Sequence, residues 1–362
     1  MSSVWGKNIK ISIFGESHGI AIGVVIDGIP PGIQLDIEYI NKEMKRRAPG
    51  RNKISTSRKE GDGFEILSGY FNGRTTGTPI ASIIYNTNQK SKDYEIIKNI
   101  VRPGHADYTS YIKYSGFNDY RGGGHFSGRI TAPLVFAGAI AKQILNKRNI
   151  VIGSHIKSIG NIEEDSFNMI NLDKSLLINL TNKEFPVIED ENEKRMKEYI
   201  LKLKEEKDSI GGIIETAVVN LPVGIGSPFF DSVESRLSHL IFSIPAVKGI
   251  EFGAGFSITK LKGSMANDEM YVEEGKVKTY SNNNGGVLGG ITNGMPLIFR
   301  TAIKPTPSIG TVQRTVDISI MKNTSIEIKG RHDPCIVPRA VPVVEAAAAI
   351  GLLDLIMEKG GI

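Results

Sequence analysis

The sequence of 362 residues contains a single cysteine and only six histidines. One cysteine, Cys335, excludes an intrachain disulfide and a cysteine-based zinc site, and it is consistent with a reducing compartment. No apolar run approaches the roughly 18 residues that a membrane-spanning helix needs. Residues 1–10 are too polar for a signal peptide and too short for an arginine-rich transit peptide. We therefore expect a cytoplasmic protein without a membrane partner.

A strong excess of one charge is also absent, because 44 basic residues are set against 39 acidic ones and the net charge is +5. The basic residues are scattered among many loops, and no aromatic stacking platform accompanies them. This pattern disfavours an RNA-binding module, so we expect no nucleic-acid partner. An anionic small-molecule substrate fits the charge balance at least as well.

Glycine, in contrast, is abundant at 40 residues, most of them in short clusters. The clearest cluster is the segment 121–129, Arg-Gly-Gly-Gly-His-Phe-Ser-Gly-Arg. Consecutive glycines let the backbone adopt positive φ and approach a ligand closely. We expect Thr131 to cap a buried helix over 134–144, with Pro133 in its first turn. A glycine-rich loop before a helix N-terminus is typical of an anion site; the alternative is a tight turn with surface arginines.

Two further loops carry an imidazole. The segment 15–19, Gly-Glu-Ser-His-Gly, lies between strands predicted over 10–14 and 22–26, which makes it the tip of a hairpin. The segment 102–107, Arg-Pro-Gly-His-Ala-Asp, begins with a turn, and Asp107 either orients His105 or caps a helix that begins near Tyr108. The histidines lack the spacing of metal ligands, so we expect no metal site.

Other polar loops have both a functional and a structural interpretation. Basic residues at 45–47 end a helix that Asp36 caps, where they either compensate the helix dipole or clamp a phosphate or carboxylate. Asparagines in the glycine-rich segment 281–290 either bond the amide edge of a ligand or turn the chain. The segment 304–308, Lys-Pro-Thr-Pro-Ser, offers a lysine and two hydroxyl groups to a phosphate. Asp333 is either a paired cap or a candidate base.

The alternation of strand and helix patterns predicts an α/β fold. We expect two or three strands within 61–85, strands over 211–219, 248–256 and 295–303, a solvated helix over 189–207 and an alanine-rich helix over 341–359. Asp231 is expected to cap a helix that ends at Pro245. The order strand, turn, helix, strands, helix recurs, so we predict one domain over 1–362 with two repeats, about 8–150 and 208–360. No Gly-x-Gly-x-x-Gly follows a strand, which excludes a Rossmann fold.

Six of these segments, taken in order, resemble the chorismate synthase family: 15–19, 102–107, 121–129, 282–290, 304–306 and 330–334. The likeness covers nearly the whole chain. It departs at 125–129, where many members have Arg-Ser-Ser-Ala-Arg and this chain has His-Phe-Ser-Gly-Arg. Whether His125 and Phe126 meet the cofactor by side chain or by backbone therefore stays open. The resemblance implies an α+β sandwich with helices packed between antiparallel sheets, and a homotetramer.

The resemblance also implies the chemistry. Members are lyases that use reduced FMN in an anti 1,4-elimination of phosphate from 5-enolpyruvylshikimate 3-phosphate, which gives chorismate in the last step of the shikimate pathway. Whether NADPH reduces the flavin on the enzyme or an external flavin reductase does so stays open. A flavin-free phosphatase or lyase that uses the same arginines is the alternative.

The implied roles fall on positions of this sequence. His18 would protonate the leaving phosphate with help from Ser17, and an imidazole is suited to proton transfer near neutrality. His105 would set the protonation of the reduced flavin. Asp333, helped by Ser127, would relay a proton at flavin N5. The substrate's phosphate and carboxylates would bind Arg47, Lys53, Arg102, Arg129 and Arg339. Flavin contacts would come from His125, Phe126, Ser127, Pro245, Ala246, Gly289, Lys304, Pro305, Thr306, Pro307, Ser308 and Arg331.

Overall fold

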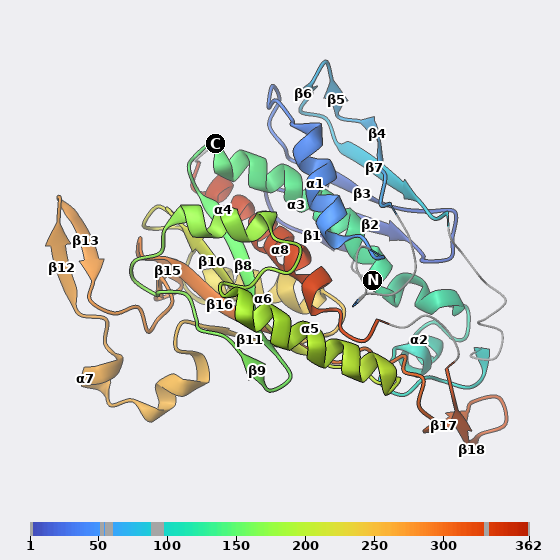
Figure 1. Cartoon of the computed structure of the whole chain (residues 1–362). Helices are drawn as coiled ribbons and strands as arrows, with labels where there is room; N and C mark the ends of the chain where they lie inside the picture. The colour runs from blue at the N-terminus through green and yellow to red at the C-terminus, as the bar shows by residue number, and fades with distance from the viewer. Residues whose placement is uncertain (1–2, 51–53, 55–60, 88–97, 329–332, 361–362) are drawn as a thin grey trace.

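Two five-stranded antiparallel sheets enclose a layer of helices (Figure 1). The structure, a computed structural model, describes residues 3–50, 54, 61–87, 98–328 and 333–360. The first sheet contains, in spatial order, β1 (Val4–Trp5), β2 (Lys10–Gly15), β3 (Ala21–Asp27), β7 (Ile80–Tyr85) and β4 (Glu65–Ser68). The second contains β11 (Val247–Phe252), β16 (Leu297–Ile303), β10 (Gly212–Val219), β8 (Val151–Ile159) and β9 (Ile162–Glu163).

The helices between the sheets are α1 (Ile37–Arg47), α3 (Thr131–Asn146), α6 (Val233–Ser243) and α8 (Val337–Glu358). α3 packs along α8, and it also contacts β3 and β7, while α8 contacts β8 and β10. Because sheet or helix covers α3 and α8 on nearly every side, almost all of their residues are apolar and buried. The predicted sandwich of helices between antiparallel sheets is confirmed.

α8 corrects one expectation from the sequence. It begins before the predicted range, and by length and composition it could cross a membrane. However, 94% of its most apolar window is buried inside the protein. Glu345 and Asp354 interrupt the apolar run, and both are buried and paired with cations in the core. α8 is therefore a core helix.

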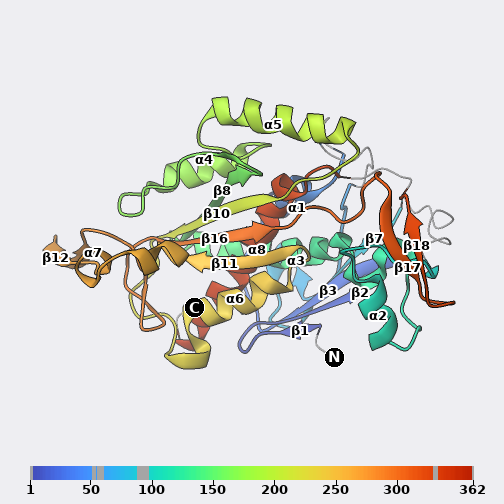
Figure 2. The ribbon, with the colours of Figure 1, turned by 90° about the horizontal axis from the view of Figure 1, so that it is seen from below.

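α4 (Lys174–Asn182) and α5 (Asp190–Glu205) cover the outer face of the second sheet (Figure 2). Leu177 of α4 belongs to a small apolar cluster that includes Ala217 of β10. α5 confirms the predicted solvated helix, because Met196 and Ile200 are buried while most of its other side chains are not. These two helices lie between β9 and β10 in the chain.

The other elements are short. The helices are α2 (Asp107–Lys113) and α7 (Gly263–Ala266), with 3-10 turns over Arg121–Phe126, Gly128–Ile130, Phe229–Asp231 and Gly255–Lys260. The strand pairs are β5 (Tyr70–Phe71) with β6 (Arg74–Thr75), β12 (Met270–Glu273) with β13 (Lys276–Thr279), β14 (Val287–Leu288) with β15 (Ile291–Thr292), and β17 (Gln313–Asp317) with β18 (Lys322–Ile326).

The two sheets have matching strand orders, which bears on the predicted repeats. The order β2-β3-β7-β4 in the first sheet corresponds to β8-β10-β16-β11 in the second. α1 follows β3 as α6 follows β10, and α3 follows β7 as α8 follows β16. This correspondence supports the proposed duplication. It also moves the start of the second repeat from 208 to Val151, because β8 is the counterpart of β2 and the segment with α4 and α5 is inserted after it.

Most predicted elements are present, and the errors lie at their ends. Asp36 caps α1, since its side chain accepts a hydrogen bond from the amide of Tyr39. Thr131 is not an N-cap: it is the first residue of α3, and its hydroxyl donates to the carbonyl of Gly128. Ser232, rather than Asp231, caps α6 by accepting from the amide of Ser235. The region 61–85 holds four strands, β4 to β7, instead of two or three.

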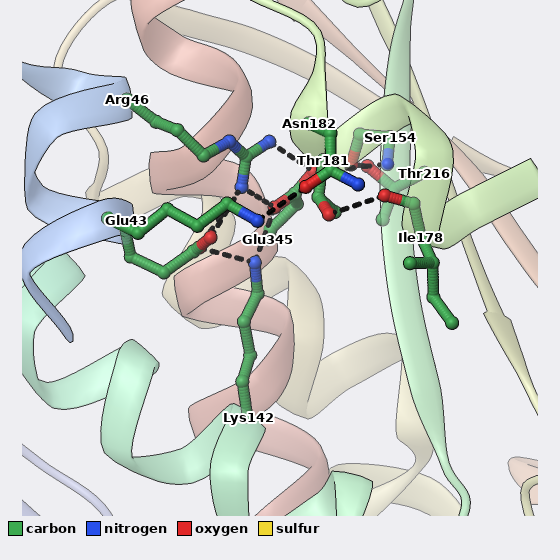
Figure 3. Close-up of polar contacts among 10 residues, drawn as sticks. Glu43, Arg46, Lys142, Ser154, Ile178, Thr181, Asn182, Thr216 and Glu345 are labelled. Carbon is green, nitrogen blue, oxygen red and sulfur yellow. Dashed lines mark hydrogen bonds and ion pairs between the residues drawn. The ribbon is translucent and has the colours of Figure 1, made fainter. Parts of the chain in front are cut away.

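A buried ion cluster, formed by Glu43, Arg46, Lys142 and Glu345, joins three core helices (Figure 3). Arg46 Nη1 lies 2.6 Å from Glu345 Oε2 and 3.0 Å from Glu43 Oε1, and Lys142 Nζ lies 2.7 Å from Glu43 Oε2. Burial alone would raise the pKa of Glu43, but Arg46 and Lys142 outweigh it and lower that pKa to about 2. The cluster fixes α1, α3 and α8 relative to one another, and α1 carries Arg47 into the site described next.

Candidate active site

Three polar loops, far apart in the sequence, meet around residues 121–124, which we call the glycine loop. The amide of Ser17 donates to the carbonyl of Gly124 at 3.2 Å, and the Ser17 hydroxyl donates to the carbonyl of Arg121 at 3.3 Å. A Cβ atom on Gly122 would lie only 2.5 Å from Nε2 of His18 and 2.8 Å from Oγ of Ser17. Gly122 also has φ +59°, so both the lack of space for a side chain and the left-handed backbone conformation require glycine here.

The same loop contacts the second predicted catalytic imidazole. A Cβ atom on Gly123, whose φ is +87°, would lie 2.8 Å from Cε1 and 3.0 Å from Nε2 of His105. His18 is 4% exposed. The two histidines, which are 87 positions apart in the sequence, therefore lie against adjacent glycines of one loop.

Asp107 orients His105, which resolves the two alternatives left by the sequence. Its Oδ1 lies 2.6 Å from Nδ1 of His105, and its two oxygens accept from the amide, Nε and Nη2 of Arg102 at 2.9, 2.8 and 2.7 Å. Burial would raise the pKa of Asp107, but the hydrogen bonds from Arg102 and His105 outweigh burial and hold that pKa well below its usual range. Asp107 is therefore an ionised carboxylate near neutral pH.

Four of the predicted site residues meet in an arginine–aspartate cluster, formed by Arg47, Asp62, Arg129, Asp333 and Arg339. Arg47 Nη1 lies 2.6 Å from Asp62 Oδ2, and Arg129 pairs with the other oxygen of the same carboxylate. Arg339 pairs with Asp333, and its Nε donates to the carbonyl of Arg47 at 3.1 Å. The side chains of Arg47 and Arg129 are only 3% and 7% exposed.

The cluster connects to the chain that follows the glycine loop. Arg47 donates from Nη2 to the carbonyl of Gly128 at 3.1 Å and from Nε to Thr131 Oγ1 at 3.2 Å. Burial would raise the pKa of Asp62, but Arg47 and Arg129 lower it. Sequence reasoning missed Asp62. The available signal was a carboxylate between two glycines, Gly61 and Gly63, in a chain whose loops are rich in arginine.

The segment predicted to contact the flavin, 304–308, packs against the loop of Arg102 and His105. Lys304 Nζ donates to the carbonyl of Gly104, and Ser308 Oγ accepts from Arg102 Nη1 at 3.4 Å. The amide of Lys304 donates to the carbonyl of Ala246 at 2.9 Å, which joins the predicted Pro245–Ala246 pair to this region. Burial lowers the pKa of Lys304, and the neighbouring cation Lys248 lowers it further. Lys304 is thus a cation placed where an anion would stabilise it.

His125, which departs from the family pattern, binds another loop of the same chain. Its Nδ1 donates to the carbonyl of Gly15 at 2.8 Å, so its side chain is fixed on the loop that carries His18. The Phe126 ring lies 6.1 Å, centroid to centroid, from the ring of Tyr114. The Ser127 hydroxyl accepts from the amide of Arg129 at 3.3 Å and caps the turn over Gly128–Ile130.

Gly289 is the predicted cofactor residue that the structure does not bring to the others. Gly290 accepts a hydrogen bond from the amide of Val233, at the start of α6, whereas Ala246 follows the end of α6. The helix has 11 residues, about 16 Å at 1.5 Å per residue. The nearby asparagine side chains turn the chain: Asn282, 2% exposed, donates to the carbonyls of Met169 and Pro296 and accepts from Gly286. Lys53 and Arg331 lie outside the described residues.

The arrangement can bind and protonate an anion. The four arginines are matched by only three aspartates, and Lys304 adds a further positive charge close to Arg102. The imidazole of His105 lies beside Arg102, and Asn86 links Arg129 to the loop of His18, since it accepts from Arg129 Nε and donates to the carbonyl of Gly19. Such a site suits a small molecule with several negative charges and a leaving group that needs a proton. Among the described residues, no group of three or more acidic, histidine or cysteine side chains could hold a metal ion.

Comparison with known proteins agrees with this geometry. A family model described as chorismate synthase matches residues 9–357. A relative named chorismate synthase from Dehalococcoides mccartyi is 48% identical over 360 residues, which are 99% of this chain and 98% of the relative. Another with that name, from Methanocaldococcus jannaschii, is 48% identical over 370 residues, covering 100% of this chain and 97% of its own.

A comparison of the fold with solved structures gives the same family. A solved structure titled "Crystal Structure of Chorismate Synthase" superposes with a TM-score of 0.78 and 34% identity, and the match covers 99% of this chain and 94% of the other. The family model matches nearly the whole chain, and the relatives are 48% identical to it over nearly its full length, so both establish common ancestry. Both matches extend over the whole site. The chain therefore belongs to the chorismate synthase family.

Proposed function

We propose that the protein converts 5-enolpyruvylshikimate 3-phosphate to chorismate and phosphate by an anti 1,4-elimination that requires reduced FMN. As a member of its family it is a lyase of the shikimate pathway. The observation that carries the finer proposal is the meeting of His18 and His105 at the glycine loop, with Arg102 and the arginine–aspartate cluster beside them. A substrate with one phosphate and two carboxylates matches such a surplus of guanidinium groups.

The residues present fit a bound FMN. The hydroxyl of Thr306 is buried and has no hydrogen-bond partner among the described residues, and Lys304 nearby is a cation whose pKa burial lowers. A phosphate group in this position would satisfy both. Gly122 and Gly123 let the imidazoles of His18 and His105 lie directly against the loop backbone, where a Cβ atom would clash with them. When bound, reduced FMN supplies electron density to the allylic C–O bond and accepts the ring hydrogen, chemistry that side chains do not provide.

The protein's own groups would bind the substrate and manage protons. His18 protonates the departing phosphate oxygen, and Ser17, fixed on the carbonyl of Arg121, helps to orient that oxygen. His105 sets the protonation of the flavin through Nε2, the nitrogen that faces Gly123. Asp333, with the help of Ser127, relays the proton at flavin N5.

We assign the arginines different roles in binding the substrate. We propose that Arg102, Arg129 and Arg339 bind its anions directly, with Lys53 beside them. Arg47 is 3% exposed and donates to Asp62, Gly128 and Thr131. Because these acceptors engage its guanidinium, we propose that Arg47 contributes positive potential and holds Asp62, the partner of Arg129, instead of binding the substrate directly.

We further propose a cytoplasmic homotetramer. Large apolar side chains are exposed on the single chain, for example Phe229, Phe230 and Phe256 at 85%, 90% and 82%, and an oligomer would cover such residues. Light scattering coupled to size exclusion measures the mass, and a stable monomer would exclude the proposal. NADPH consumption by the purified protein with FMN distinguishes reduction on the enzyme from reduction by an external flavin reductase.

The reaction is tested by mixing the purified protein anaerobically with 5-enolpyruvylshikimate 3-phosphate and photoreduced FMN. We expect phosphate and a new cyclohexadiene absorbance to appear together, and only with reduced flavin. His18→Ala should abolish both signals, while His239→Ala, which removes an exposed histidine beside Trp5, serves as the matched control. Phosphate release that does not depend on flavin would instead establish a flavin-free phosphatase or lyase.

A further inference from the structure

One carboxylate, that of Asp107, holds two groups of the site at once. Its Oδ1 lies 2.6 Å from Nδ1 of His105 and accepts from Arg102 Nη2 at 2.7 Å, while Oδ2 accepts from the amide and Nε of Arg102. The Asp107 side chain is 9% exposed, and those of Arg102 and His105 are 5% and 15% exposed. These three side chains therefore form one buried unit behind the glycine loop.

The contacts determine which nitrogen of His105 carries the proton in its neutral form. A carboxylate oxygen can only accept, so the short contact to Asp107 requires a proton on Nδ1. Arg102 Nη2, 3.1 Å from the same nitrogen, is a donor and would favour the opposite tautomer, but this contact is longer than the 2.6 Å contact to Asp107, and Nη2 already donates to Asp107 Oδ1 at 2.7 Å. Nε2 is then the nitrogen with the free lone pair, and it is the one that faces Gly123.

We propose that Asp107 is a positioning residue for the elimination: its carboxylate keeps His105 in the tautomer with the proton on Nδ1 and so presents Nε2 to the ligand over the glycine loop. This inference rests on the proposed function, since it assigns Asp107 to the histidine that acts on the flavin. Asp107 itself touches neither substrate nor flavin in this account. It acts through His105, and the bond to Arg102 holds it in place.

The chain supplies a matched control for the arginine part of this arrangement. Asp119 binds Arg121 in the same way, accepting from its amide, Nε and Nη2 at 3.0, 2.9 and 2.8 Å. The imidazole that acts electrostatically on Asp119 is His18, not His105. Asp119→Asn therefore perturbs an equivalent aspartate–arginine pair next to the glycine loop without changing what holds His105.

The tautomer can be measured on the ligand-free protein, independently of its activity. Solid-state ¹⁵N NMR of histidine-labelled protein resolves six histidines, and His105→Ala identifies the signals of His105. We expect the neutral ring of His105 to carry its proton on Nδ1 and to leave Nε2 unprotonated. In Asp107→Asn the neutral ring should become a mixture, because an amide can donate to Nδ1 as well as accept from it. Asp119→Asn should leave the His105 signals unchanged. An unprotonated Nδ1 in the wild type, or unchanged signals in Asp107→Asn, would overturn the proposal.

A double-mutant cycle tests whether the effect on turnover passes through His105. We expect Asp107→Asn to lower kcat by about 100-fold or more in the wild type, the scale of a lost acid–base contribution. In the His105→Ala background the same change should alter kcat by less than about threefold, because the group through which Asp107 acts is gone. An equal loss in both backgrounds would show that Asp107 acts through Arg102 or the fold, and would refute the proposal. If the wild type shows no turnover with reduced FMN, the proposed function fails, while the NMR result still decides the role of Asp107.

Discussion

Replacing Gly122 by alanine adds one methyl group at the closest point between the glycine loop and His18. The new Cβ would lie 2.5 Å from His18 Nε2 and 2.8 Å from Ser17 Oγ, whereas ordinary contacts of a Cβ begin at 3.4 Å. Either the imidazole or the loop must therefore shift by about 1 Å, the difference between the contact distance and the available space. The change tests directly whether this contact sets the position of His18.

The expected effects on stability and on turnover differ in size. Alanine at φ +59° costs about 1–2 kcal/mol of folding free energy because its Cβ approaches the backbone in the left-handed region. A catalytic group misplaced by about 1 Å can lose on the order of 100-fold in rate. We therefore expect a folded Gly122→Ala protein whose phosphate release under saturating anaerobic conditions is about 100-fold slower.

Gly73→Ala is the matched control, because Gly73 has φ +80° and no described heavy atom lies within 4 Å of a Cβ built on it. It should lose a similar 1–2 kcal/mol in denaturant unfolding and keep its rate within about threefold. The reasoning is refuted if Gly122→Ala releases phosphate at the wild-type rate, or if Gly73→Ala loses as much activity as Gly122→Ala.

Three further predictions concern the core. Lys142→Met leaves Glu43 and Glu345 with Arg46 as their remaining cation in the cluster, so the free energy of unfolding in denaturant should fall by about 3–5 kcal/mol. A fall of less than about 1 kcal/mol would contradict this prediction. The pKa of Glu43 is lowered from 4.5 to about 2, so ionised Glu43 stabilises the fold above pH 4.5, and this stabilisation is lost as the pH falls towards 2. Glu43→Gln should remove this part of the acid dependence of the unfolding free energy. An unchanged acid profile would argue against this account. Burial raises the pKa of Cys335 to about 12, so iodoacetamide at pH 8 should label the thiol only after unfolding, as followed by mass spectrometry.

The sequence predicted the parts of the site that local chemistry signals. Glycines beside histidines marked the loops of His18, His105 and residues 121–124, and the amphipathic and alternating patterns located most helices and strands. What it could not predict was that these loops meet. The contact between Gly122 and His18 joins residues 104 positions apart, and it depends on the packing of β2 and β3 against α3.

Features that depend on tertiary partners were missed for the same reason. Asp62 is recognisable only once Arg47 and Arg129 are seen on its two oxygens. The predicted helix over 341–359 included Glu345 and Asp354, but the sequence could not show that both are buried, because their cations, Arg46 and Arg236, come from other helices.

Gly289 is a position that the sequence motif alone assigns to the flavin site. It lies near the start of α6, while Ala246 follows the end of the same helix. Its proposed part in the flavin site stays a prediction.

The central claim, that the two histidines packed against the glycine loop act on the substrate and the flavin, is tested most directly by a crystal structure of the protein with FMN and 5-enolpyruvylshikimate 3-phosphate. We predict a phosphate oxygen of the substrate within about 3.2 Å of His18 Nε2, and the flavin ring beside His105 with Nδ1 of that residue still on Asp107. A substrate bound elsewhere, with both imidazoles away from the ligands, would contradict the account.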